Sequence, residues 1–372
     1  MKLLVQPGDG VVPLVKAISN AKSNIEILIF RFDRGEIEKA LISAVSRGVA
    51  VHALIAYTNR GGEKSLRELE MRLLAAGITV ARTDDDLVRY HGKLMTIDHR
   101  ELYLLAFNFT YLDMEHSRSF GVVTRNRKIV QEAGKLFEAD SKRQAYAPGI
   151  PTFIVSPLNA RKELSAFIRK AKNELLIYDP KVGDRAMIRL LEERARAGVH
   201  IKIIGQVSRK SGKLAVRKLS QMRLHARVIL RDRYFAFIGS QSLRTAELDA
   251  RREVGMIFRD RKIGRRLAKI FEDDWRVAEQ SKEQVVTKEP VPASKIAKKL
   301  AKAVAKTLPP VAPVMDGVVK EVAGQKANVE VNAEQLEETV KDAVKEAVKG
   351  AVKDVVQKGV EHTREEEPDR GH

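Results

Sequence analysis

The chain has 372 residues, no cysteine and a formal net charge of +19. The absence of cysteine excludes disulfides and thiolate metal sites. The N-terminus carries an apolar run of only three residues, and no apolar stretch approaches the roughly 18 residues that span a bilayer. We therefore expect a cytoplasmic protein, free or peripheral on a membrane, with no signal peptide or transmembrane segment.

The same order of predicted elements occurs twice along the chain. A strand pattern is followed by a helical apolar pattern, a glycine and a second apolar run with strand character. The matching segments are Ile25–Phe30 with Glu174–Tyr178, and Ile37–Ile55 with Met187–Gly205. In both copies the helical pattern ends at a glycine, Gly48 or Gly198, which is typical of a helix C-terminus.

A short motif follows each copy. Residues 91–98 read His-Gly-Lys-Leu-Met-Thr-Ile-Asp, and residues 225–232 read His-Ala-Arg-Val-Ile-Leu-Arg-Asp. Both have the spacing His-x-basic-x4-Asp, and the copies are 134 residues apart. The histidine lies 43 residues after the glycine in the first copy and 27 residues after it in the second. The difference predicts an insertion in the first half, a Gly-Gly loop followed by a helix over Asn59–Leu74.

Each motif supplies an imidazole, a fixed cation and a carboxylate within eight residues. Cleavage of a phosphodiester needs such a set: a nucleophile or acid, a positive clamp for the phosphoryl oxygens, and an orienting group. A lone histidine in an apolar run is usually structural. Because this pattern occurs twice in register, His91 and His225 are better explained by shared chemistry.

Strand and helix patterns alternate through both halves, which predicts an α/β fold with helices covering mixed sheets. Each half, about 140 residues, is of domain size. We expect two αβ repeats, over residues 1–148 and 149–280, packed with pseudo-twofold symmetry. Residues 281–372 read as a proline-containing linker followed by an amphipathic helical tail that is partly disordered.

The positive charge is unevenly distributed. Lys and Arg exceed Asp and Glu by 4 in residues 1–150 and by 15 in residues 151–280, whereas residues 281–372 are balanced. A field of this sign attracts nucleic acid or an anionic membrane surface, and plain solubility is the alternative explanation. In the tail, Ser294–Thr307 and Glu334–Val360 have helical patterns that suit a membrane surface, a helical partner or a solvated tail without a specific role.

The paired motifs and the repeat around them resemble the phospholipase D superfamily, whose signature His-x-Lys-x4-Asp-x6-Gly-Ser-x-Asn occurs twice. The resemblance covers roughly residues 1–275 and implies two phospholipase D-like repeats with the site at their interface, needing no cofactor and no metal. The candidate site residues, which match the signature or stand in for it, are His91, Lys93, Asp98, Asn108, His225, Arg227, Asp232, Ser240, Ser242 and Glu253. Within this set, Asp98 and Asp232 are expected to support the local strand–loop geometry.

The two copies depart from the signature in different ways. The first has Leu-Ala in place of Gly-Ser, and the second has Arg227 for Lys and Ser242 for Asn. A glutamate often follows the motif in this superfamily, and here it is Glu253; the equivalent position in the first copy is Ser119. Because a serine cannot orient an imidazole as a carboxylate does, we expect the two histidines to have different environments.

The resemblance also implies a mechanism. One imidazole attacks phosphorus and forms a phosphohistidine, while the other protonates the leaving alcohol and then activates water or an acceptor alcohol. We expect His91 to be the nucleophile, because its motif keeps the lysine, and His225 to be the general acid. Lys93 and Arg227 would bind the non-bridging oxygens.

Three functions are compatible with the sequence. The first is a phosphodiesterase or phosphatidyltransferase of phospholipase D or cardiolipin-synthase type that acts on phospholipid, as the fused double motif and amphipathic tail indicate. The second is a metal-independent nuclease acting on DNA or RNA, which the basic second half favours. The third is a non-catalytic member that binds anionic membrane or nucleic acid. No oligomeric state is predicted.

Overall fold

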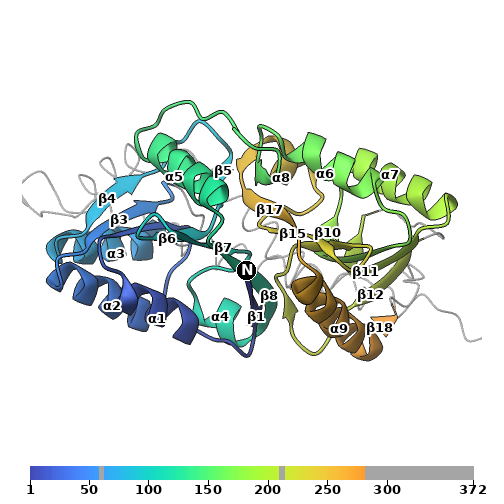
Figure 1. Ribbon diagram of the computed structural model, residues 1–372, viewed down its shortest axis with the longest axis horizontal. Coiled ribbons are helices and arrows are strands. Elements are labelled where there is room, and N and C mark those ends of the chain that lie inside the picture. The colour runs from blue at the N-terminus through green and yellow to red at the C-terminus, as the bar shows by residue number, and fades with distance from the viewer. Residues whose placement is uncertain (58–62, 209–213, 281–372) are drawn as a thin grey trace, which may run out of the picture. The chain divides into compact units, whose positions relative to one another are not determined.

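The computed structural model describes residues 1–57, 63–208 and 214–280. Both predicted repeats belong to one compact unit, Met1–Lys282 (Figure 1). The linker and tail helices expected over 281–372 lie outside the described residues. No helix within the described ranges is long and apolar enough to cross a membrane.

A mixed sheet forms the centre of the first repeat. Its strands lie in the order β1 (Lys2–Gln6), β8 (Ser117–Thr124), β7 (Glu101–Leu105), β6 (Leu94–Ile97), β2 (Asn24–Ile29), β3 (Ala50–Ile55) and β4 (Thr79–Arg82). From β2 to β4 the strands are parallel, and from β1 to β2 each neighbouring pair is antiparallel.

The second repeat has a sheet of the same order. It runs β9 (Phe153–Val155), β17 (Val254–Arg259), β15 (Phe235–Gly239), β14 (Val228–Arg231), β10 (Glu174–Val182), β11 (His200–Val207), β12 (Ala215–Lys218) and β18 (Glu279–Gln280). Strand by strand, β9 to β12 correspond to β1 to β4 of the first sheet. The mixed α/β fold with two repeats is therefore confirmed.

Helices flank both sheets in matching order. The first repeat has α1 (Val12–Asn20), α2 (Gly35–Ser46), α3 (Glu63–Ala75), α4 (Tyr111–Glu115) and α5 (Arg127–Ser141); the second has α6 (Ala160–Arg169), α7 (Arg185–Arg196), α8 (Thr245–Asp249) and α9 (Arg261–Val277). Helix α3 is the extra element, because only residues 208–214 separate β11 from β12. The helix of the predicted insertion is thus present, one residue longer at its C-terminus than expected.

The two repeat glycines act as the sequence predicts. Gly48 follows α2 with φ +83°, and Gly198 follows α7 with φ +89°. A side chain is strained in this left-handed region, whereas glycine adopts it without steric cost and so ends the helix. The chain then turns into β3 or β11, each parallel to the strand before the helix.

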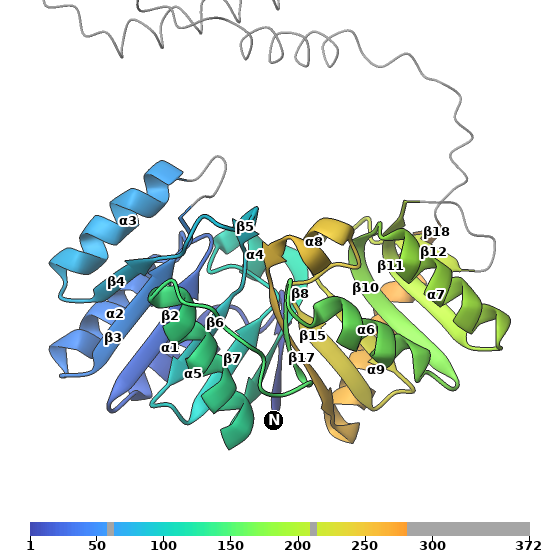
Figure 2. The same ribbon diagram turned by 90° about the horizontal axis from the view of Figure 1, so that it is seen from above.

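Three apolar cores hold the unit together. One lies between the first sheet and helices α1 to α3, and a second lies between the second sheet and α6 to α8. The third core contains α5, α9 and side chains from both sheets, among them Phe120 and Leu104 of the first repeat and Phe153 and Tyr178 of the second. Figures 1 and 2 show the two sheets side by side, with β7 and β8 next to β15 and β17. The repeats therefore share a core and form one body.

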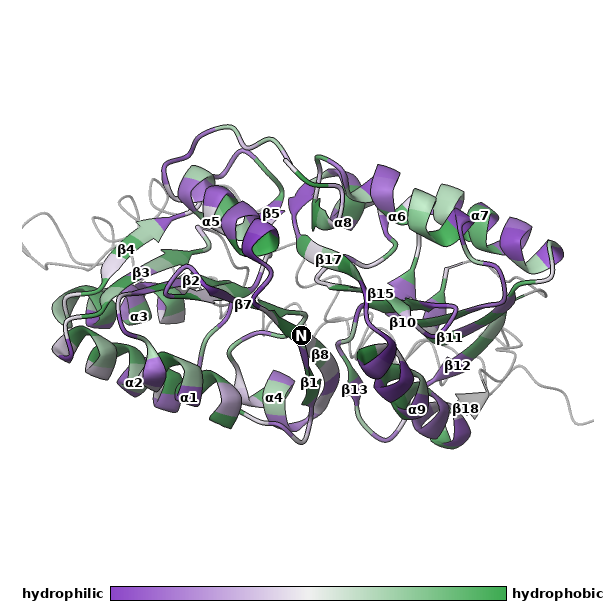
Figure 3. Cartoon of the chain, viewed as in Figure 1, coloured by the Kyte–Doolittle hydropathy of each residue, from purple (hydrophilic) through white to green (hydrophobic). Residues whose placement is uncertain are grey.

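The hydropathy of the elements follows this arrangement. The strands of both sheets are mostly hydrophobic, whereas the helices, α9 most clearly, carry hydrophilic faces (Figure 3). Burial of the apolar strand surfaces is the main favourable contribution to such packing, at roughly 25 cal/mol per Å².

Two short strand pairings join the repeats at equivalent places. Strand β5 (Arg89–Tyr90) pairs with β16 (Arg251–Arg252), and β13 (Arg223–Leu224) pairs with β8. Buried ion pairs accompany them: the Arg118 guanidinium lies 2.7 Å from the Asp274 carboxylate, and that of Arg252 lies 3.2 Å from Asp140. Residues 118 and 252, and residues 140 and 274, are each 134 apart. The interface thus has the expected pseudo-twofold symmetry.

Candidate active site

Both motif histidines lie where a short strand of one repeat crosses to the other. His91 follows β5, and its backbone N–H donates to the carbonyl of Arg252 at 2.7 Å. His225 follows β13, and its N–H donates to the carbonyl of Arg118 at 3.0 Å. Both histidines are buried. Backbone hydrogen bonds between the repeats therefore fix the position of each histidine, independently of its side-chain contacts.

A carboxylate of the second repeat holds the His91 ring. The Nδ1 atom of His91 lies 2.8 Å from Oε2 of Glu253, which is completely buried. The ring also packs edge-on against Phe30, with centroids 4.4 Å apart. A neutral imidazole with Nδ1 beside a carboxylate keeps its proton on Nδ1, so that Nε2 carries the reactive lone pair.

A carboxylate of the first repeat lies against the His225 ring. Its Nδ1 atom lies 3.1 Å from Oδ2 of Asp113, on the short helix α4. Asp113 also accepts hydrogen bonds from the backbone N–H and side-chain Nδ2 of Asn108, at 2.8 and 2.7 Å. Ser119 led us to expect different environments for the two histidines; His225 also has a carboxylate at Nδ1, but it comes from Asp113 and not from the position of Ser119. Ser119 instead donates to the carbonyl of His225, at 3.3 Å.

Two buried cations accompany the imidazoles. The Nζ atom of Lys93 donates to the carbonyl of His91 at 2.6 Å, and Nη1 of Arg227 donates to the carbonyl of His225 at 3.1 Å. Lys93 is 1% exposed and Arg227 is 8% exposed. Each cation donates to the backbone carbonyl of the histidine in its own motif. Arg227 therefore occupies the position that is equivalent to that of Lys93, although a guanidinium differs in shape from an ammonium.

The environment keeps both imidazoles neutral near pH 7. Burial, together with the charges of Lys93 and Arg227, holds the pKa of His91 well below its usual range. Burial and Arg227 lower the pKa of His225 to about 3, although Asp113 opposes the change. Burial also lowers the pKa of Lys93 to about 7. The site therefore has unprotonated ring nitrogens beside positive charge, as nucleophilic attack on a phosphate anion requires.

The two carboxylates differ in electrostatic state. Burial raises the pKa of Glu253, even though Lys93 and Ser240 act against it. Burial acts in the same direction on Asp113, but the adjacent imidazole of His225 and the nearby Arg223 hold the pKa of Asp113 well below its usual range. Asp113 is thus the more firmly ionised partner.

The remaining polar residues of the signature support these groups. Ser242 Oγ accepts a hydrogen bond from Nε of Arg227 at 3.3 Å. Ser240 Oγ accepts one from the backbone N–H of Val254 at 3.0 Å, beside Glu253. Asn108 holds Asp113, as described above. Ser240, Ser242 and Asn108 therefore support the charged residues that surround the imidazoles.

Comparison with known proteins identifies the family. The sequence matches the family model of the cardiolipin synthase, PLD-like domain, over residues 14–141 and 164–275, one match in each repeat. The chain belongs to this phospholipase D-like family. The resemblance predicted from the paired motifs is therefore confirmed.

Individual relatives agree with the assignment. The chain is 27% identical over 130 residues to a mitochondrial cardiolipin hydrolase of Danio rerio, a match that spans 34% of this chain and 56% of that protein. Two solved structures have the same fold. A polyphosphate kinase of Porphyromonas gingivalis has a TM-score of 0.62 at 21% identity, covering 74% of this chain and 47% of that one. A phosphatidylserine synthase of Haemophilus influenzae has a TM-score of 0.58 at 12% identity, covering 82% and 93%.

The motif aspartates of this phospholipase D-like chain lie away from the imidazoles. Asp98 follows the far end of β6 and accepts from the backbone N–H groups of Lys22, Ser23 and Asn24 at 2.7–3.1 Å. Asp232 does the same at the far end of β14, accepting from residues 172–174 at 2.7–3.2 Å. Both anchor the turn that begins the adjacent strand, so we leave them out of the proposed catalytic set.

The structure adds two acidic residues that the sequence analysis passed over. Asp113 lies five residues after Asn108, and Glu247 lies five residues after Ser242, each at the start of a short helix. Glu247 accepts from the backbone N–H of Ser242 at 2.7 Å, as Asp113 does from Asn108. This matched acidic spacing in both copies was a usable signal. Among the described residues, no cluster of three or more His, Cys, Asp or Glu side chains is arranged to hold a metal ion.

Proposed function

We propose that this chain cleaves or transfers the phosphodiester of a phospholipid through a phosphohistidine intermediate. One observation carries the proposal: two buried imidazoles lie beside Lys93 and Arg227, and each has its Nδ1 atom against a carboxylate of the opposite repeat. This arrangement supplies two equivalent Nε2 atoms and two cations, the groups that a two-step displacement at phosphorus uses.

In the first step, Nε2 of His91 attacks phosphorus and forms a P–N bond. The P–O bond to the leaving alcohol breaks, and the alkoxide takes the Nε2 proton of His225, which is neutral in the free site and takes up this proton when the anionic phosphodiester binds. In the second step His225 removes a proton from water, or from an acceptor alcohol, whose oxygen attacks phosphorus while the P–N bond breaks. The products are a phosphomonoester or a new phosphodiester, and both histidines return to their starting states.

The roles follow from the two carboxylates. The firmly ionised Asp113 stabilises an imidazolium at His225, which suits a group that must hold a proton. Glu253, whose pKa is raised, gives less support to a positive charge on His91. His91 is therefore better suited to act as the neutral nucleophile and His225 as the acid and base.

Lys93 and Arg227 supply charge stabilisation. They are held in place by backbone carbonyls in a buried site, where a positive charge acts more strongly on an anion than it does in water. The incoming phosphodiester adds a negative charge beside His225, which raises the affinity of that imidazole for the proton that it donates.

The choice of phospholipid rests on the family and on charge. The matched family is described as cardiolipin synthase, PLD-like domain, and residues 151–280 carry a net charge of +15. A net positive charge of this size favours a peripheral position on an anionic membrane, where such an enzyme meets its lipid.

The test compares substrates in the presence of EDTA. Purified full-length protein is given vesicles containing labelled cardiolipin and phosphatidylglycerol and, separately, single-stranded and plasmid DNA. We expect lipid turnover, lost in His91→Ala and in His225→Ala. Turnover of DNA alone would contradict the lipid assignment while leaving the phosphodiesterase chemistry in place.

A nuclease is the second candidate, because the same +15 charge attracts nucleic acid. DNA turnover that is abolished by His91→Ala would establish it. If neither substrate is turned over and binding to anionic vesicles or DNA falls with salt, the chain is a non-catalytic binding member of its family.

A further inference from the structure

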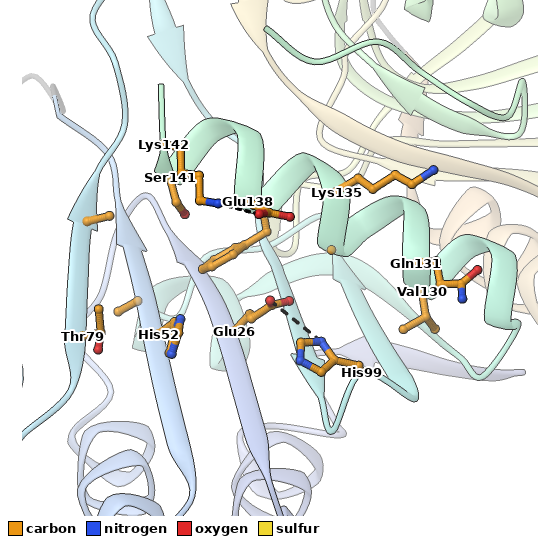
Figure 4. Close-up of a pocket in the computed structure, with 14 residues that line it drawn as sticks. Glu26, His52, Thr79, His99, Val130, Gln131, Lys135, Glu138, Ser141 and Lys142 are labelled. Atoms are coloured by element: carbon orange, nitrogen blue, oxygen red, sulfur yellow. Dashed lines mark hydrogen bonds and ion pairs between the residues drawn. The ribbon is translucent and has the colours of Figure 1, made fainter. Parts of the chain in front are cut away.

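A cavity of about 730 Å³ lies in the first repeat, on the sheet face covered by α5 and apart from the paired histidines. Strands β2, β3 and β4 form one wall, and α5 from Val130 to Ser141 forms the other (Figure 4). Its apolar lining includes Ala53, Ala81 and Phe137, and Figure 4 shows Glu26, His52 and His99 extending from the sheet. Its size is that of a small-molecule site.

The second repeat shows what closes the equivalent space. Asp140 of α5 corresponds to Asp274 of α9, so that Ser141 corresponds to Trp275. The Trp275 ring stacks on Phe271 with centroids 5.8 Å apart and lies under the guanidinium of Arg217 at 4.6 Å. In the first repeat these three positions hold Ser141, Phe137 and Ala81, all of which line the cavity. The first repeat therefore lacks the aromatic ring and the guanidinium that cover this face in the second repeat.

A helical glycine widens the same space. Gly134 lines the cavity, and a Cβ atom added there meets nothing within 4 Å. Its counterpart in α9 is Ala268, which is buried in the shared core. A glycine inside a helix costs roughly 1 kcal/mol relative to alanine, so that this opening has no structural benefit of its own.

The floor of the cavity is polar where the second repeat is apolar. Glu26, which is 8% exposed, accepts a hydrogen bond through Oε2 from Thr96 at 2.7 Å. Strand register matches this pair to Leu176 and Leu230, which face each other on β10 and β14. Oε1 of Glu26 lies 3.9 Å from Nδ1 of the exposed His99, beyond hydrogen-bond distance. A carboxylate at this position, near the apolar Ala53 and Ala81, favours a ligand with N–H donors.

We propose that this cavity binds a guanine nucleotide. The base lies between sheet and helix, on the side where Trp275 lies in the second repeat. Guanine presents two adjacent donors, N1–H and the 2-amino group, to the carboxylate of Glu26. Adenine places an acceptor at N1 and is repelled by the same carboxylate. Lys135 and Lys142 of α5 also line the cavity but pair with Glu132 and Glu138, at 3.7 and 2.7 Å, so that recognition rests on the base.

The test is calorimetric titration of the full chain with guanosine, GMP, IMP and AMP. Guanosine is included because it lacks the phosphate that Lys93 and Arg227 would attract. We expect guanosine and GMP to bind with a Kd below about 1 mM, IMP about tenfold more weakly because it lacks the 2-amino group, and AMP not measurably. Equal binding of GMP and AMP, or no binding of guanosine at this concentration, contradicts the proposal.

Variants that copy the second repeat locate the site. Ser141→Trp and, independently, Gly134→Leu fill the cavity and are expected to weaken guanosine binding at least tenfold, with circular dichroism and thermal melting to show that each variant folds. The double variant Glu26→Leu with Thr96→Leu should also lose guanosine binding. The matched control is Trp275→Ser, which opens the second repeat over Leu176 and should leave affinity and stoichiometry unchanged. Undiminished binding in folded Ser141→Trp and Gly134→Leu overturns the proposal.

Discussion

Each imidazole of the proposed site depends on a carboxylate from the opposite repeat. His91 pairs with Glu253, and His225 pairs with Asp113. The two carboxylates come from different positions of the repeat, because the counterpart of Glu253 is Ser119. The orienting function is therefore preserved across the twofold axis while the residue that performs it has changed.

Replacement of Asp113 tests whether this residue orients His225 as Glu253 orients His91. Asp113→Asn removes the charge that supports an imidazolium at His225 and permits the wrong tautomer, so we expect kcat to fall about 100-fold or more. Ser119→Ala is the matched control and should change kcat less than about threefold. Because Asp113 acts through His225, the double variant Asp113→Asn with Ser119→Glu should recover part of the loss. A merely structural role would give unfolding, seen by thermal melting, without such rescue.

The pH dependence of activity tests Lys93. Its pKa of about 7 means that the ammonium is present below this pH and is lost as the pH rises above it. We expect kcat/KM to fall above pH 7 in wild type and the fall to move beyond pH 9 in Lys93→Arg, because an arginine stays charged. Arg227 shows that the symmetric position accommodates a guanidinium. An unchanged alkaline limb in Lys93→Arg would show that another group titrates.

The same lysine should cost stability. A lysine whose pKa is lower in the folded state than in the unfolded state destabilises the fold. The destabilisation is complete below the pKa of the folded state, and it disappears as the pH rises to the pKa of the unfolded state. Lys93→Met is therefore expected to raise the free energy of unfolding by up to about 4 kcal/mol near pH 6, with the gain shrinking towards pH 10. Urea unfolding at several pH values measures it. A variant less stable than wild type at pH 6 would contradict the burial argument.

Most, but not all, of the residues of the proposed site were predictable from the sequence. His91, Lys93, His225 and Arg227 were predicted because their spacing is local and occurs twice. Asp113 was not, since its contact with His225 joins residues 112 positions apart across a symmetric interface.

At the scale of elements, the short strands β5, β13 and β16 join the repeats. Each has two residues, too few for a sequence pattern, and each exists because a partner strand of the other repeat pairs with it. The longer strands and the helices that end at Gly48 and Gly198 were predictable because their apolar periods are set within one segment.

Removal of one partner from the ion pairs that accompany these strands should destabilise the fold. Asp274 accepts from Arg118 at 2.7 and 2.9 Å and from the hydroxyl of Tyr178 at 2.6 Å. Asp274→Ala leaves these buried donors unpaired, and we expect a loss of roughly 3–5 kcal/mol in urea unfolding. The neighbouring Asp273, half-exposed on the same helix, is the control, and Asp273→Ala should change stability by less than about 0.5 kcal/mol. Equal effects would show that the inter-repeat pair contributes little.

At the scale of the whole molecule, the unit Met1–Lys282 contains every residue of the proposed site. A chain truncated after Lys282 should therefore fold and hydrolyse a soluble diester such as bis(4-nitrophenyl) phosphate with kcat within about twofold of the full chain. Circular dichroism checks the fold. Loss of folding would show that residues 283–372 belong to the core, and loss of activity alone would show that they complete the site.

The central claim is that the two repeats build one two-histidine displacement site, and trapping the intermediate tests it most directly. With bis(4-nitrophenyl) phosphate the leaving group needs no proton, so that His225→Ala can complete the first step but not the second. The account predicts a burst of one equivalent of nitrophenol per site in this variant. An acid-labile, base-stable phosphoryl adduct should then be found on His91 by mass spectrometry. No burst, or an adduct on a residue other than His91, would contradict it.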